Sequence, residues 1–269
     1  MSEITIISGT LKEIEFKSEY LSSYGFYCYD VRKPIAPPQK QTVVDVSKVS
    51  GVNQISKKFE SNELVLKGYI ETTDYATLKT ALDNLAAFLH SDTDEQLIIS
   101  DEDDRYWNCQ YLDSPIIEEK DNYTLVDLIF TCNDPFAYAI TPDTDTQAGI
   151  TTSGETFIIA NSGHHYAFPV ITITFNQSQS HIYVQNNNIS GNRFDISKSF
   201  VAGDVLEFDC KASTIKLNGS SSIAGLGDGG QSKAECILLA TGNNEMEVGT
   251  DDVSLDMDVD MSFNKVYFY

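Results

Sequence analysis

The residues with the most regular chemical spacing in this chain are three carboxylates, Asp256, Asp258 and Asp260. On a β-strand they would share one face at intervals of about 7 Å. Such a row could hold Ca²⁺ if a loop supplied further oxygen ligands. The alternative is a solvated strand face that discourages edge-to-edge aggregation. We expect the solvated face and no metal or cofactor, and keep the three aspartates as the candidates for a metal site.

Other motifs favour structure over catalysis. His164 and His165 are adjacent, so on a strand they point to opposite faces, and His181 lies some fifteen residues on. The segment 225–230 matches G-x-G-x-x-G but lacks the preceding strand and following helix of a dinucleotide site. The acidic run 92–104 lacks the glycine and glutamate of an EF-hand loop, and we expect two turns flanking a strand. With no hydrolase motif or phosphate loop, the sequence predicts no enzyme.

Aromatic side chains in the second half raise the alternative of sugar binding, because flat rings stack on pyranose faces. Tyr166 and Tyr183 are the candidate glycan contacts, although tyrosines in strands more often belong to a core. The only tryptophan, Trp107, lies in the first half. The sequence therefore predicts little or no glycan binding by the second half.

The composition limits the partners. The chain has 269 residues and a formal net charge of −22, with 12 basic and 24 acidic residues through residue 139 and 6 and 16 after it. Such a surface repels DNA, RNA and anionic membranes. Five scattered cysteines without C-x-x-C spacing predict reduced, mostly buried thiols. No uncharged apolar run could span a bilayer, so no membrane insertion is expected.

The elements that must position these residues change type at Asn133-Asp134-Pro135, a strong stop signal. Before it we predict strands and one helix that begins after Thr73 as its N-cap and runs to about His90. After it we predict a linker over residues 140–154 and then only strands. The boundaries are 1–139 for the first domain and 155–269 for the second.

Two segments characterise the domains. Residues 31–56, which contain three prolines, have little capacity to form a core and predict an extended arm or long hairpin that needs a partner surface. Residues 253–263 alternate apolar and polar side chains, which indicates a long strand with one buried face. Repeated short strands without helices predict a β-sandwich of jelly-roll type for the second domain.

Four blocks of sequence resemble the distal tail protein family of siphophages, the phages with long flexible tails, and the resemblance covers nearly the whole chain. They are Tyr24-Gly25-Phe26 with the proline bend Pro34–Pro38, the helix within 71–90, the strand and stop 128–138, and the pattern from Ile159 through Ile173. The chain departs from the family at 49–53, where relatives often carry a Gly-Arg-Asp-Gly-like turn.

The resemblance implies a mainly β protein. Its first domain would be a β-barrel or split-barrel-like unit with one helix that forms a hexameric ring. Its second would be a galectin-like or carbohydrate-module-like sandwich. The ring would stack on the tail tube at the distal end of the virion tail, join the tail-tip or baseplate hub and receptor-binding proteins, and let DNA pass without specific binding. Synthesis would take place in the cytoplasm of the host bacterium. We expect the subunit interface in the first-domain sheet and the arm, at Leu64, Leu66, Ile70, Val43 and Val44.

Overall fold

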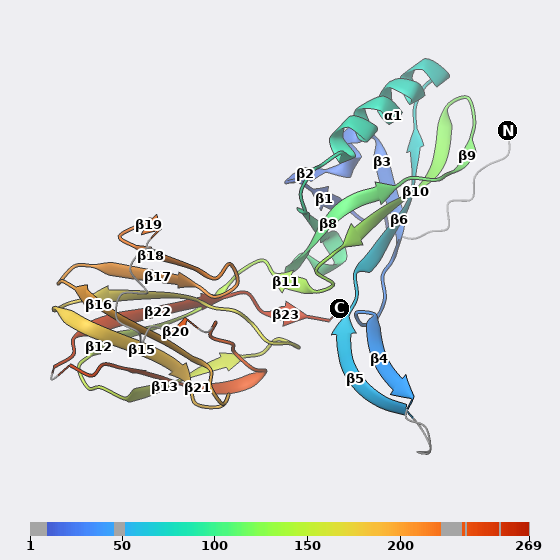
Figure 1. Ribbon diagram of the computed structural model, residues 1–269. Coiled ribbons are helices and arrows are strands. Elements are labelled where there is room, and N and C mark those ends of the chain that lie inside the picture. Colours follow the sequence, from blue (N-terminus) through green and yellow to red (C-terminus); the bar gives the residue numbers. More distant parts are fainter. Residues whose placement is uncertain (1–9, 46–51, 222–232, 235, 253, 269) are drawn as a thin grey trace. The chain divides into compact units, whose positions relative to one another are not determined.

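The computed structural model describes residues 10–45, 52–221, 233–234, 236–252 and 254–268 (Figure 1). It is mainly β, as predicted, and divides into two compact units, which are Met1–Tyr138 with Phe268–Tyr269 and Ala139–Tyr267. The unit boundary lies one residue from the predicted position. No helix in the described part of the chain combines the length and the apolar character needed to cross a bilayer.

Unit 1 is a mixed assembly of short and long strands around one helix. Its sheet follows the order β2-β1-β7-β8-β10-β6-β3, and β9 pairs with β10. The strands of unit 1 are β1 (Ile14–Phe16), β2 (Glu19–Tyr20), β3 (Phe26–Arg32), β4 (Gln39–Asp45), β5 (Val52–Phe59), β6 (Asn62–Glu71), β7 (Glu95–Ile99), β8 (Arg105–Asp113), β9 (Ile116–Glu119), β10 (Tyr123–Cys132) and β11 (Ala137–Ala139), with 3₁₀ turns η1 (Leu21–Tyr24) and η2 (Ser100–Glu102).

The sheet of unit 1 does not close into a barrel. Its path ends at β2 on one side and β3 on the other. Among the described residues, the segment before β1 is joined to β3 by an isolated bridge between Lys12 and Cys28, in which the Lys12 N–H donates to the Cys28 carbonyl over 2.9 Å. The predicted barrel is thus an open, partly split sheet, since one bridge cannot replace a continuous ladder of strand hydrogen bonds.

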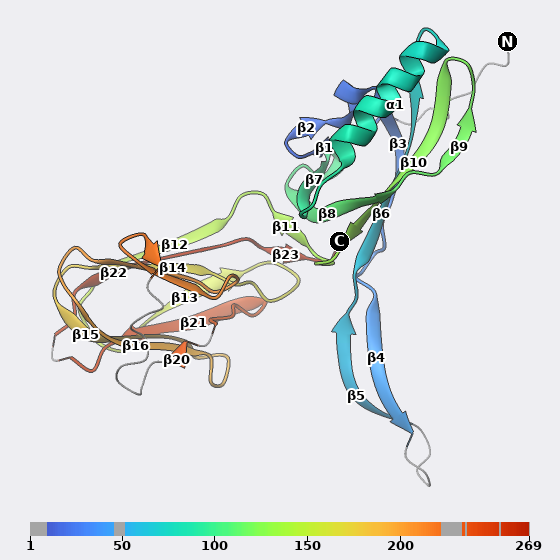
Figure 2. The same ribbon diagram turned by 45° about the horizontal axis from the view of Figure 1, so that its top comes forward.

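Helix α1 (Tyr75–Leu89), the one α-helix of the described residues, packs over this sheet in both views (Figures 1 and 2). Its residues Leu78, Leu85 and Leu89 are buried. The N-cap is Asp74 rather than Thr73, because the Asp74 Oδ1 accepts from the Thr77 N–H over 2.9 Å. A carboxylate one position later thus satisfies the open end of the helix.

The predicted arm is a two-stranded hairpin. Strands β4 and β5 pair only with each other among the described residues. They extend beyond the rest of unit 1 in Figures 1 and 2. An isolated hairpin of this kind is marginally stable at best, which makes the arm the part of unit 1 least able to support itself.

Unit 2 is a sandwich of two sheets. One has the order β12-β22-β14-β17-β18-β19 and the other β13-β21-β15-β16-β20. The strands of the two sheets are β12 (Asp143–Ile150), β13 (Glu155–Asn161), β14 (Val170–Phe175), β15 (Gln179–Asn186), β16 (Arg193–Phe200), β17 (Val205–Asp209), β18 (Thr214–Leu217), β19 (Ser220–Ser221), β20 (Lys233–Ala234), β21 (Gly242–Gly249) and β22 (Met257–Phe263). Strand β23 (Val266–Tyr267) lies outside both sheets and pairs with β11.

Stacked phenylalanines join the two sheets of unit 2 across its core. The ring centroids of Phe175 and Phe200 lie 4.2 Å apart, and those of Phe194 and Phe208 lie 4.3 Å apart. Strand β22 buries alternate residues as predicted, although it begins only at Met257. Val253, where the predicted strand starts, lies outside the described residues.

The predicted linker is largely a strand. Residues 140–154 contain β12, which pairs antiparallel with β22. Its sequence is almost entirely polar, which is why the strand was missed. An edge strand needs backbone partners on one side only and can leave its side chains in solvent, so apolar content is a poor guide there.

Candidate interaction sites

The predicted interface leucines of β6 are in the core of their own unit. Leu64, Leu66 and Ile70 are each 0% exposed, so their side chains are not available to a neighbouring subunit. The prediction is corrected for these three residues. An alternating pattern on a strand predicts that one face is buried. It does not show whether the residues packed on that face belong to the same chain or to a neighbouring subunit. Val43 and Val44 lie on β4, opposite Gln54 and Asn53 of β5, in the arm.

The root of the arm is anchored by aromatic rings. Phe59, at the end of β5, lies 5.1 Å from Phe136 and 5.9 Å from Phe268 between ring centroids. The Glu60 N–H donates to the Pro38 carbonyl over 2.9 Å. At the proline bend beside this root, Ile35 is 85% exposed. The arm is therefore fixed at its base while its two edges and a large apolar side chain remain open.

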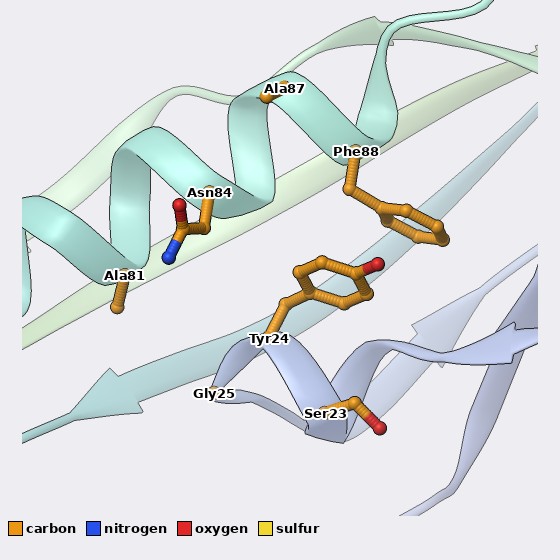
Figure 3. A pocket seen from close by; sticks show the side chains of 7 residues that line it. All are labelled: Ser23, Tyr24, Gly25, Ala81, Asn84, Ala87 and Phe88. Atoms are coloured by element: carbon orange, nitrogen blue, oxygen red, sulfur yellow. The ribbon is translucent and has the colours of Figure 1, made fainter.

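A shallow groove of about 640 Å³ lies between α1 and η1 (Figure 3). Tyr24 and Phe88 stack at one end of it, with centroids 4.1 Å apart. Small residues, including Ala81 and Ala87, line the rest. The Tyr24 hydroxyl donates to Glu19 over 2.7 Å, and this hydrogen bond raises the pKa of Tyr24. The groove has no arrangement of acid and base suited to catalysis.

The three candidate metal ligands do not converge on one point. Each carboxylate accepts a hydrogen bond from a different donor. The pairs are Asp256 with Asn176 Nδ2 at 3.0 Å, Asp258 with the Gly149 N–H at 2.7 Å, and Asp260 with Thr146 Oγ1 at 2.6 Å. No group of three or more potential metal ligands forms within the described residues. The three aspartates therefore hold neighbouring segments of unit 2 in place through these hydrogen bonds.

Tyr183, a candidate glycan contact, is engaged at one ring face, at its hydroxyl and by the backbone of the neighbouring strand. The Arg193 guanidinium lies over one face at 3.8 Å from the centroid. Gly249 is directly opposite on β21, and a Cβ added there would lie 2.4 Å from the Tyr183 hydroxyl. The Tyr183 hydroxyl also donates to Glu247 over 2.8 Å. A ring held in this way offers no free platform for a pyranose, whereas Tyr166 is 47% exposed.

The histidines do not come together as a site. His181 is buried, and its Nε2 lies 2.6 Å from Asp195 while its Nδ1 accepts from the Asp251 N–H over 3.2 Å. Burial opposes ionisation of Asp195, but hydrogen bonds from His181 and Arg193 outweigh it, and the pKa of Asp195 is lowered. His164 makes an edge contact with the ring of Tyr267. Residues 225–230 lie outside the described part of the chain.

Sequence reasoning missed a contact inside the boundary motif. The Tyr138 hydroxyl donates to Asp134 over 2.5 Å, and its ring stacks on Tyr106. Burial, together with this hydrogen bond, raises the pKa of Tyr138. The Asn-Asp-Pro motif therefore also holds the end of unit 1 in place through a side-chain hydrogen bond. The sequence signal for this contact was a carboxylate, Asp134, four residues before a tyrosine, Tyr138.

Comparison with known proteins agrees with this architecture. A family model described as the phage tail protein RIFT-related domain matches residues 20–132, and one described as the siphovirus-type tail component, C-terminal domain, matches residues 162–267. The distal tail protein of Bacillus phage SPP1 is 26% identical over 191 residues, which are 70% of this chain and 72% of that protein.

A solved structure shares the fold along almost the whole chain. The crystal structure of SPP1 Dit, described as a paradigm of hub adsorption apparatus in phages that infect Gram-positive bacteria, matches with a TM-score of 0.78 and 16% identity. The match covers 95% of this chain and 99% of that chain. The chain belongs to the distal tail (Dit-like) protein family of siphophages and has a structural role in the phage tail.

Proposed function

We propose that six copies of this protein form a ring at the distal end of the tail, which connects the tail tube to the tail-tip or baseplate hub and to host-recognition proteins. The observation that carries the proposal is the β4–β5 arm, which pairs with no other strand among the described residues. Because such a hairpin is marginal alone, a neighbouring subunit is the natural source of the missing contacts. The prediction of Val43 and Val44 as interface residues stays a proposal.

The charge of the chain fits a conduit for DNA. A net charge of −22, spread over both halves, leaves few basic side chains to displace counterions from phosphates. DNA would therefore pass through such a ring without adhering to its wall. We infer that the protein acts by assembly, without catalysis.

The mass of the full chain in solution tests the ring. Mass photometry should give a dominant species at six times the chain mass of 29.8 kDa. If two rings associate back to back, the species should have twice the mass of one ring. A single species at the chain mass over the micromolar range would contradict the proposal.

Carbohydrate adhesion through unit 2 is the second candidate. The exposure of Tyr166 and Phe168, 47% and 42%, favours it, because neighbouring exposed rings can stack on sugars. The engaged ring of Tyr183 does not. A glycan array probed with the full chain tests this function, and loss of any signal in Tyr166→Ala is the result that would assign it.

A further inference from the structure

The root of the arm concentrates positive charge in an acidic protein. Lys40 of β4 and Lys58 of β5 are direct partners in the hairpin register, and Lys57 is the next residue. Like charges directly opposite each other destabilise an antiparallel pair. Lys40 has Glu60 at 3.6 Å, but in the described part of the chain Lys57 and Lys58 have no ion-pair partner. This arrangement favours an acidic surface as the partner of the arm.

The edge of unit 1 formed by β9 has the complementary properties. Strands β8 and β9 follow each other along one flank of β10, with Asp113 opposite Ile129 and Ile116 opposite Val126. Among the described residues β9 pairs with β10 alone. Leu112 and Ile116 on this flank are 55% and 50% exposed. An open edge with apolar side chains is a template for a further strand.

The charge of this edge is opposite to that of the arm. Segment 113–121 has one basic residue, Lys120, against four acidic residues. The acidic residues are Asp113, Glu118, Glu119 and Asp121. The acidic turn 101–104 is a poorer partner, because Lys12, Lys33 and Arg105 already pair with its carboxylates. In segment 113–121, Lys120 pairs with Glu118 at 2.9 Å, whereas Asp113 and Asp121 have no ion-pair partner among the described residues. The β9 edge, which pairs with β10 alone among the described residues, thus combines an unpaired flank, apolar side chains and negative charge.

We propose that β5 of one subunit adds to the β9 edge of the next subunit, with Lys57 and Lys58 beside the acidic residues of segment 113–121. The inference rests on the proposed ring and names the surface that receives the arm. Strand β5 has 8 residues and is long enough to pair with the 4 residues of β9. A contact between two different surfaces of the same chain is heterologous and closes into a ring when the rotation permits.

Charge reversal in the full chain tests the pairing. Lys57→Glu with Lys58→Glu, and separately Glu118→Lys with Asp121→Lys, should each weaken assembly at least about tenfold, because like charges then face each other. Combining all four changes should restore assembly to within about threefold of the wild type. The matched control, Lys211→Glu with Lys216→Glu in unit 2, should assemble normally. Mass photometry over a concentration series gives the midpoint for each variant.

The outcomes separate this inference from the ring itself. A monomeric wild type contradicts the ring. If the wild type forms a ring and either double variant assembles as well as the wild type, the β5–β9 pairing is wrong and the ring stands. The same conclusion holds if both double variants lose assembly and the variant with all four changes does not recover it. If a charge variant does not fold, cysteine pairing decides. In a Cys236→Ser background, mixed Lys57→Cys and Glu118→Cys chains should form an intersubunit disulfide on mild oxidation, and its absence in assembled rings overturns the pairing.

Discussion

Gly68, in the middle of β6, is predicted to be intolerant of any side chain. A Cβ built there would lie 2.3 Å from the Phe26 Cζ and 2.7 Å from the Tyr27 carbonyl oxygen. Real Cβ atoms do not approach other atoms so closely, and the carbonyl belongs to the backbone of β3, so it cannot rotate away. Overpacking of this kind costs about 1–3 kcal/mol. The lower backbone entropy of alanine offsets about 0.5–1 kcal/mol.

Gly68→Ala should therefore destabilise unit 1 by about 1–2 kcal/mol. For a unit of this size, that corresponds to a fall in Tm of roughly 3–8 °C. Trp107 is the only tryptophan of the chain and is 2% exposed within unit 1, so its fluorescence reports the unfolding of that unit alone. Adding Phe26→Leu removes the nearest ring atoms and should recover part of the loss, as a positive coupling in a double-mutant cycle.

The matched control is Gly249→Ala in unit 2, which introduces the same methyl group under Tyr183. It should leave the Trp107 transition unchanged, because the two units have separate cores. A Trp107 transition in Gly68→Ala that is unchanged or moves upward would refute the close packing of Phe26 on Gly68. Loss of the transition in both variants would refute the independence of the two units.

Three further outcomes follow from the buried groups. Asn244→Ala should lower the free energy of unfolding of unit 2 by about 2 kcal/mol in chemical denaturation, because the buried amide hydrogen-bonds both the N–H and the carbonyl of Ala240. An unchanged unfolding midpoint would contradict that role. The folded-state pKa of Asp195 is lowered from 3.8, so its contribution is complete above that value and is lost as the pH falls below it. Asp195→Asn should thus lower Tm at pH 7 and approach the wild type progressively as the pH falls below 3.8, and a pH-independent difference would count against the ion pairs. Thiol titration should find one reactive group, Cys236, in the native protein and five after unfolding, since the other four are buried; two or more in the native protein would contradict this.

The sequence predicted elements whose side-chain pattern matches their own burial. The helix was placed to within a residue because Leu78, Leu85 and Leu89 recur on one face, and β22 because alternate residues are buried. The arm was predicted from the opposite property, its lack of apolar residues. In each case the local sequence pattern was sufficient to predict the element, because each face of the element has the same kind of environment, core or solvent, along its whole length.

Features decided by distant partners were not accessible in this way. Residues 236–240 form no strand, only an isolated bridge between Leu239 and Ala167, and amides from other segments bind their backbone. Asn186 and Asn192 donate to the carbonyls of Leu238 and Cys236, each over 2.7 Å. The lysine pair of the arm root was missed for a similar reason, since residues 40 and 58 become neighbours only through the register of the hairpin.

The two units are not divided by a single cut in the sequence, although the sequence predicted a first domain of residues 1–139. Unit 1 also includes Phe268, which contacts Phe59 and Phe136 at the root of the arm. A fragment without residue 268 therefore loses part of the anchor of the arm, and assembly is best measured on the full chain.

Electron microscopy of the purified full chain tests the central claim most directly. Class averages of negatively stained particles should show closed rings with six-fold symmetry and a central opening. Particles the size of one chain at the concentrations at which mass photometry is performed, or closed rings with another symmetry, would contradict the account of this protein as a hexameric distal tail ring.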